Sequence, residues 1–202
     1  MAIFLIGISV HTKAAFDFSN TFITSADGLS HNSISSLYQD KKGFVWCCTS
    51  NGLNRYDGYS FISFFPNKAE DVSLIDNRVR NVREDKNGFL WVYLDSQSFS
   101  CFDMKKGKFV DYTGCGAYQR HYQKIMIASN GDVWLWHKDK GCCRVSFKNG
   151  KFTSVFYNIK KGNIASDIIN FVAEGSGNSV WVGTGKGLLK VDPSKTVLIN
   201  KE

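Results

Sequence analysis

The sequence has little of what marks disordered, membrane-spanning or metal-binding proteins. It contains two prolines in 202 residues and no block of like charges. Beyond its first residues it has no apolar run approaching the roughly 20 residues that a membrane helix needs. None of its six cysteines has the Cys-x-x-Cys spacing of a structural zinc site. With 43% hydrophobic and 14% aromatic residues, the sequence predicts an ordered globular chain without a metal site.

The cysteines are explained more simply as strand residues than as a disulfide framework. They are Cys47, Cys48, Cys101, Cys115, Cys142 and Cys143, and they include two adjacent pairs. Neighbouring residues of a strand point to opposite faces, so each pair fits as two small apolar side chains. Disulfide pairing stays open, because an exported chain could form it and the sequence does not say which cysteines would pair.

The formal net charge of +7 requires a polyanion partner to be considered. The lysines are scattered beside Gly or Asn in expected turns, where a solvated charge is the simplest explanation. They include Lys41, Lys42, Lys105, Lys106, Lys108, Lys148, Lys151, Lys160 and Lys161. We therefore expect no nucleic-acid contact, and an acidic polysaccharide partner stays open.

Residues 1–15 are typical of a secretory signal peptide. An apolar run ends at Val10, and Thr12 with Ala14 forms a small-x-small cleavage site. The missing basic residues at the start leave two alternatives, a buried first strand and a misplaced start. We expect an exported chain with no membrane span once the signal is removed, and a folded region over residues 16–202.

Tryptophan reveals an internal repeat. Trp46, Trp91, Trp134 and Trp181 are separated by 45, 43 and 47 residues. Each follows a turn that contains glycine, which tolerates the positive φ of a tight hairpin. These glycines are Gly43, Gly88, Gly131 and Gly177. One structural unit therefore occurs four times.

Each unit divides into four short strands. The expected inner strands are 34–39, 79–84, 122–128 and 168–173, each followed by the Trp-containing strand. Third strands are expected at 53–57, 99–103, 142–147 and 188–192, and outer strands at 59–64, 108–112 and 151–156. Four strands per unit and a period near 45 residues predict an all-β fold of β-propeller blades, built from four four-stranded antiparallel repeats. The blades would span about 19–64, 65–112, 113–157 and 158–202.

The first copy, residues 27–58, resembles the two-component regulator propeller repeat. It contains His31-Asn-Ser-Ile, the run from Gly43 to Trp46, and Asn51-Gly52. The second copy keeps Asp76-Asn77 and the run of residues 85–91, whereas the third and fourth copies are looser. The resemblance covers about residues 19–196. It implies the periplasmic sensor region of Bacteroides-type hybrid two-component histidine kinases, whose rings have about seven blades.

The resemblance also implies a function. The expected role is a ligand-sensing segment of a signal-transduction receptor that responds to glycan-derived oligosaccharides and controls transcription through a phosphorelay. The chain carries none of the kinase motifs, so no catalysis and no cofactor are expected of it. The expected partners are an oligosaccharide, the remaining propeller blades and the downstream receptor domains, with a homodimer possible in the full receptor. The alternative is a propeller scaffold or secreted adaptor that binds no small molecule.

The candidate ligand-binding residues lie where each inner strand begins, at one face of a propeller. The set is His31, Asp76, Asn77, Arg78, Arg120 and His121, with Trp136 added because it stands outside the repeat spacing. Their mixed charge suits hydroxyl-rich or acidic sugars. The simpler alternative for Asn32 and Asn77 is that their side chains cap turns. The histidines lack the spacing of a metal site or of a nucleophile–base pair, so no catalytic or metal residues are expected.

The ring is expected to be incomplete. Residues 18–24 read as an outer strand without a partner, because 196–200 already supplies the outer strand of the fourth blade. We therefore expect part of a seven-bladed ring, with exposed apolar faces on the first and last blades that make the isolated chain associate.

Overall fold

The computed structural model describes residues 20–112 and 122–192. The strands are β1 (Ile34–Gln39), β2 (Val45–Thr49), β3 (Gly52–Tyr56), β4 (Phe61–Phe64), β5 (Val79–Glu84), β6 (Phe89–Leu94), β7 (Phe99–Asp103), β8 (Lys108–Val110), β9 (Lys124–Ile127), β10 (Val133–Trp136), β11 (Cys142–Lys148), β12 (Lys151–Tyr157), β13 (Ile169–Glu174), β14 (Val180–Thr184) and β15 (Gly187–Val191). Short 3₁₀ turns are η1 (Ser25–Asp27), η3 (Ile159–Lys161) and η4 (Ser176–Asn178).

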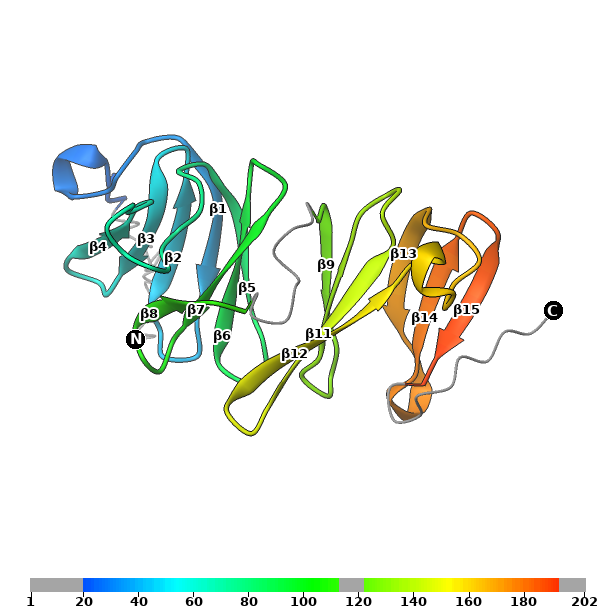
Figure 1. The fold of residues 1–202 in the computed structure, drawn as a ribbon. Coiled ribbons are helices and arrows are strands. Elements are labelled where there is room, and N and C mark those ends of the chain that lie inside the picture. The colour runs from blue at the N-terminus through cyan, green and yellow to red at the C-terminus, as the bar shows by residue number, and fades with distance from the viewer. Residues whose placement is uncertain (1–19, 113–121, 193–202) are drawn as a thin grey trace, which may run out of the picture.

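These strands form four separate antiparallel sheets in chain order, which we call blades 1 to 4. Blades 1, 2 and 3 have four strands each (β1–β4, β5–β8, β9–β12), and the described part of blade 4 has three, β13–β15. The blades stand in a row, with blades 1 and 4 at opposite ends (Figure 1). This arrangement confirms the predicted all-β propeller blades in an unclosed ring. The expected outer strand at 196–200 lies outside the described residues, as does the expected signal at 1–15.

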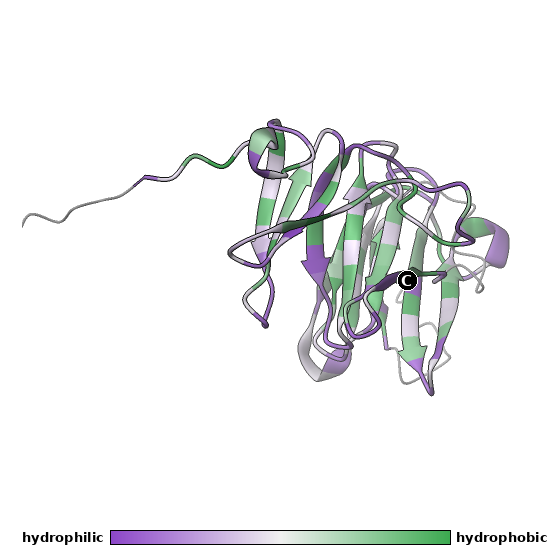
Figure 2. Ribbon diagram, turned by 90° about the vertical axis from the view of Figure 1, so that its left-hand side faces the viewer, coloured by the Kyte–Doolittle hydropathy of each residue, from purple (hydrophilic) through white to green (hydrophobic). Residues whose placement is uncertain are grey.

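The repeat is stabilised by one face of each Trp strand packing on the inner strand of the next blade. Trp46 shares a buried cluster with Val79 and Val82 of blade 2. Trp134 likewise packs with Ile169 and Val172 of blade 4. Figure 2 shows hydrophobic residues along the strands and hydrophilic ones in many of the connecting loops. Trp46, Trp91 and Trp134 therefore act as core residues between blades, as the repeat predicted, whereas Trp181 of blade 4 is only partly buried.

A buried carboxylate organises the turn before the Trp strand in blades 1 and 2. Asp40 accepts hydrogen bonds from the indole N–H of Trp46 at 2.8 Å and from the backbone N–H of Phe44 at 3.1 Å. Asp85 does the same for Trp91 at 2.9 Å and Phe89 at 3.0 Å. A single side chain thus ties the hairpin turn to the tryptophan of the blade interface.

Blades 3 and 4 keep the turn without this carboxylate. Ala128 and Gly175 stand six residues before their tryptophans, where blades 1 and 2 have aspartate. The indole N–H of Trp134 is buried with no hydrogen-bond partner among the described residues. At Gly175 an added Cβ would lie 2.6 Å from Nε1 of Trp181, so that site has no room for a side chain.

The turn of blade 4 also differs from the glycine pattern in the sequence. Gly43, Gly88 and Gly131 adopt φ of 89°, 86° and 91° three residues before their tryptophans. In blade 4 that place belongs to Asn178, with φ of 60°, and Gly177 before it has φ of 65°. Asparagine tolerates the left-handed region better than most residues, so the hairpin survives the shift.

Polar bonds join adjacent blades near these turns. Glu84 of blade 2 accepts a hydrogen bond from the hydroxyl of Tyr38 at 3.1 Å and pairs with Lys41 at 3.3 Å. The backbone N–H of Ser129 donates to Glu174 of blade 4 at 2.9 Å. Burial, followed by the bond to Glu84, raises the pKa of Tyr38 to about 12. The hydroxyl therefore keeps its proton and remains a donor across the blade 1–2 interface.

The first described residues are not the outer strand that was expected at 18–24. Residues 20–24 form no strand, and Thr24 instead caps η1. Its Oγ1 accepts a hydrogen bond from the N–H of Ala26, while Asp27 accepts one from the N–H of Thr24 at 2.8 Å. This reciprocal cap satisfies the backbone locally, so it competes with strand pairing.

The five described cysteines are buried in or beside strands. This confirms their interpretation as small apolar residues, and Cys115 lies outside the described residues. Burial raises the pKa of the Cys48 thiol to about 11 and raises that of Cys101 as well. Both thiols are therefore held in the neutral form at physiological pH.

Replacing Asp85 with alanine should lower the free energy of unfolding by about 2 to 4 kcal/mol. The substitution leaves the Trp91 indole and the backbone N–H of Phe89 buried without their acceptor, and it also removes the acceptor of the Asn87 N–H. Urea denaturation followed by tryptophan fluorescence measures the change. Asp71→Ala, at an exposed site, is the control and should stay close to the natural protein. Equal midpoints for the two variants would contradict a structural role of the carboxylate.

The pH dependence of stability gives a second test of Asp85. Burial raises the pKa of this carboxyl above 3.8, despite hydrogen bonds that lower it, the bond from Trp91 foremost. The folded state therefore holds the proton more tightly, so the stabilising contribution is full below pH 3.8 and falls as pH rises through the raised pKa. Relative to Asp85→Asn, the natural protein should lose stability across this range. Parallel curves for both proteins would show that Asp85 does not titrate differently on folding.

Candidate functional site

The candidate site lies at the edge of the blades where inner strands begin and Trp strands end, which we call the inner-strand edge. Backbone bonds between blades fix its loops. Gly52 donates to the carbonyl of Asn77 at 2.7 Å, and Gly141 donates to the carbonyl of Asp167 at 2.9 Å. Gly52 has φ of 106°, and an added Cβ would lie 2.8 Å from the carbonyl oxygen of Phe64. Only glycine allows the chain to turn this close to β4 of the same blade.

A hollow of about 600 Å³ opens at this edge between blades 1 and 2. Blade 1 supplies His31, Ser35 and the loop of Thr49, Ser50 and Asn51, and blade 2 supplies Arg78, Val79, Arg80 and Asp95. We call it the blade 1–2 hollow. It brings together two of the predicted residues, His31 and Arg78, from sites 47 positions apart in the sequence.

The two arginines of this hollow differ in how firmly Asp95 holds them. The Nε of Arg80 donates to Asp95 at 2.5 Å, which fixes that guanidinium. Arg78 is 3.7 Å from the other oxygen of Asp95, and its side chain is 71% exposed. Nδ1 of His31 accepts a hydrogen bond from the N–H of Ser33 at 2.9 Å, so the neutral ring carries its proton on Nε2. The hollow thus offers a loosely held cation and a ring N–H donor.

The other predicted residues do not line this hollow. Asp76 accepts a hydrogen bond from the N–H of Arg78 at 3.2 Å, so it shapes the loop that carries this arginine. Asn77 contributes its carbonyl to the bond from Gly52. The side chain of Asn32 accepts from the N–H of Ser25 at 2.7 Å, as expected of a residue that orders a loop. Arg120 and His121 lie outside the described residues.

Trp136 lies on the packed face of blade 3. It follows Trp134 by two positions in β10, so both rings point to the face that packs on blade 4. It is 7% exposed, and its indole N–H has no partner among the described residues. Its ring borders two smaller hollows at the inner-strand edge, of about 250 and 210 Å³. Lys124 lines both of them.

Sequence reasoning missed the residues that three β-bulges bring to this edge. The pairing register shifts within Ile34–Ser36, Val79–Asn81 and Ile169–Phe171. The extra residues are Ser35, Arg80 and Asn170, and each lines a hollow at the edge. A bulge re-aims a side chain without a sequence motif of its own. Only the recurrence of the bulge at the second residue of β1, β5 and β13 could have signalled it.

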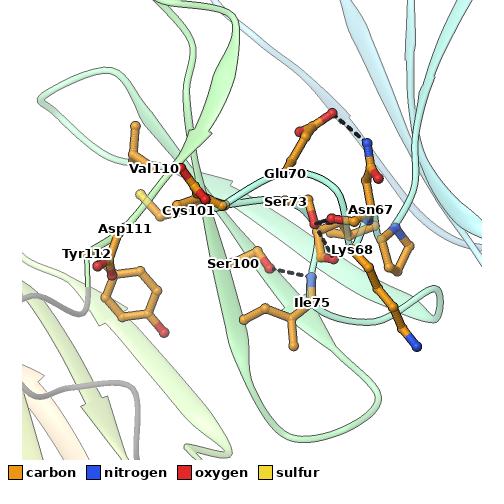
Figure 3. A pocket seen from close by; sticks show the side chains of 14 residues that line it. Asn67, Lys68, Glu70, Ser73, Ile75, Ser100, Cys101, Val110, Asp111 and Tyr112 are labelled. Atoms are coloured by element: carbon orange, nitrogen blue, oxygen red, sulfur yellow. Dashed lines mark hydrogen bonds between the residues drawn. The ribbon is translucent and has the colours of Figure 1, made fainter.

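A separate hollow of about 500 Å³ lies between the connection from β4 to β5 and the outer half of blade 2 (Figure 3). None of the predicted residues lines it. Its polar atoms are bonded to one another, since Ser100 accepts from the N–H of Ile75 at 3.1 Å and Asn67 donates to Glu70 at 2.9 Å. Its rim has both charge signs, Lys68 beside Glu70 and Asp71, so it does not select one class of charged ligand.

In the part of the chain that the structure describes, no group of three or more His, Cys, Asp or Glu side chains could hold a metal ion. Over the same residues, no helix is both long and apolar enough to cross a membrane.

The comparisons with known proteins agree with the repeat. The model of the two-component regulator propeller family matches residues 28–51 and 73–92, which confirms the resemblance in the sequence. Histidine kinase P4 of Formosa agariphila is 42% identical over 52 residues, which are 26% of this chain and 4% of that kinase. The similarity to the kinase is therefore confined to a short stretch of a much longer protein.

A solved structure shares the propeller fold. The extracellular domain of a putative one-component system of B. thetaiotaomicron superposes with a TM-score of 0.54 at 22% identity, over 90% of this chain and 27% of that one. The extracellular domain of a putative hybrid two-component system of the same organism has 19% identity and a TM-score of 0.44, over 89% of this chain and 31% of that one. The chain spans about a quarter to a third of the length of these structures.

Proposed function

We propose that this chain is a ligand-sensing, extracytoplasmic segment of a hybrid two-component receptor. Its regulator propeller repeats, the apolar start typical of an export signal, and its similarity to a histidine kinase support this role. The segment acts by binding and not by catalysis, and the phosphorelay and the control of transcription belong to other domains of the receptor. The observation that carries the proposal is the blade 1–2 hollow, where both matched repeats contribute side chains.

The ligand we propose is a glycan-derived oligosaccharide that carries acidic groups. The exposed hydroxyl and amide side chains of Ser50 and Asn51 stand on one wall of the hollow and can exchange hydrogen bonds with sugar hydroxyls. Arg78 on the opposite wall can pair with a carboxylate or sulfate, because its contact with Asp95 is long and its side chain is exposed. Lys124 and Lys138 extend the positive charge along the edge toward blade 4.

Replacing Arg78 with alanine should weaken binding of an oligogalacturonate about tenfold. The loss of one charge-assisted hydrogen bond to a carboxylate costs about 1.5 to 3 kcal/mol, part of which Arg80 can compensate. Isothermal titration calorimetry of the full chain measures the dissociation constant. A neutral malto-oligosaccharide of the same length should show no such dependence on Arg78.

Lys42→Ala is the matched control, because it removes the same charge from a turn at the opposite edge of blade 1. It should leave the affinity unchanged. If Arg78→Ala and Lys42→Ala weaken binding equally, the effect is one of net charge, and the site is not at the inner-strand edge. If the natural chain binds neither sugar, the scaffold alternative replaces the sensor role.

A further inference from the structure

We infer that two hollows beside Trp136 form a binding site for tetrahedral oxyanions, the sulfate or phosphate esters of a sugar, and that Lys124 is its central cation. The inference does not depend on a ligand in the blade 1–2 hollow. One hollow, of about 250 Å³, lies between blades 2 and 3, and the other, of about 210 Å³, lies between blades 3 and 4. Lys124 and Trp136 line both, and we call them the paired hollows.

Every charged residue that lines the paired hollows is a cation. Arg83 and Lys124 line the first hollow, and Lys124 and Lys138 line the second. Among the described residues, no aspartate or glutamate lines either of them. The blade 1–2 hollow differs, because Asp95 lines it and holds Arg80.

The protein itself does not neutralise these three cations. Within residues 20–112 and 122–192, none of the three takes part in a salt bridge. The carboxylates next to them in the sequence have other partners. Asp139 lies 2.5 Å from Nδ1 of His137, and Glu84 is paired with Lys41 at 3.3 Å. Cations that share a hollow repel one another, and a bound anion relieves this repulsion.

The walls of the paired hollows strengthen the field of the cations. The apolar side chains of the lining include four that are no more than 2% exposed, Val82, Trp91, Phe99 and Ile169. A cleft that has one sign of charge and walls of low dielectric constant raises the local concentration of counter-ions. The paired hollows therefore attract anions more strongly than the same cations would on an open surface.

The pairing of β9 with β10 places Lys124 where the two hollows meet. Lys124 is directly opposite Trp136 in the register, so the two side chains share one face of blade 3. The residue before it, Gln123, donates from Nε2 to Oε1 of Gln97 at 3.2 Å, which holds the start of β9 against blade 2. A fixed strand end thus carries an exposed ammonium group between the hollows.

An ester with three terminal oxygens suits this arrangement better than a carboxylate does. A sulfate or phosphate group can contact two cations from different sides, and each of the paired hollows has two. Each hollow has less than half the volume of the blade 1–2 hollow, which is about 600 Å³, so it takes one group and not a whole oligosaccharide. The amides of Asn81 and Asn170 can bond to the sugar hydroxyls beside the esters.

The test measures binding of two compact polyanions, sucrose octasulfate and inositol hexakisphosphate, by isothermal titration calorimetry. Titrations at about 150 mM salt, which screens distant charges, use both the natural full chain and Arg78→Ala. At least one probe should bind both chains. Lys124→Gln should weaken that binding about tenfold in each, because one charge-assisted hydrogen bond is lost. Lys124→Arg keeps the charge and should restore most of the affinity.

Lys151→Gln is the matched control, because it removes the same charge from an exposed site on β12, outside the paired hollows. It should leave the affinity unchanged. If neither probe binds the Arg78→Ala chain, the paired hollows are not an oxyanion site. Equal weakening by Lys124→Gln and Lys151→Gln would show an effect of net charge and would also overturn the inference. The oligogalacturonate titration tests the proposed function separately, so either can fail without the other.

Discussion

The packing of each Trp strand on the inner strand of the next blade is the constraint on which the rest of the structure depends. A single four-stranded sheet has two apolar faces, and Trp46 is covered only because Val79 and Val82 of blade 2 lie against it. This contact sets the register between neighbours. The register in turn brings the loop of Gly52 against Asn77 and places His31 opposite Arg78. The candidate site is therefore a product of blade packing.

The hydrogen bond from the indole to a carboxylate strengthens this contact, but the contact also forms without it. Asp40 and Asp85 occur in the two stretches that the regulator propeller model matches, whereas Ala128 replaces them in blade 3. Trp134 is still fully buried and keeps the same turn, although its N–H has no partner among the described residues. The free energy of apolar burial thus exceeds the cost of the unsatisfied N–H.

The blades could be predicted from the sequence because tryptophan spacing and turn glycines depend on local periodicity. The details of the edge could not. Arg80 reaches the hollow through a bulge, and Asn178 replaces the expected glycine, because backbone geometry at single residues has no fixed sequence pattern. Trp136 was expected apart from the repeat, yet its two-residue offset from Trp134 puts it on the packed face. Residues 20–24 form no strand because the cap at Thr24 is satisfied within a few residues.

Under the proposed function, the hollow lies where a bound ligand would act on the interface between blades 1 and 2. A ligand between Asn51 and Arg78 contacts two blades, so it stabilises the arrangement in which both walls face each other. By linkage, the free energy of binding adds to the free energy that holds blades 1 and 2 together, and any domain that changes this interface changes affinity by the same factor. The loosely held Arg78 is the group through which this coupling would act, since Arg80 is already fixed by Asp95. A sensor of this kind needs no moving lid, because the blade interface itself is the element that ligand and receptor share.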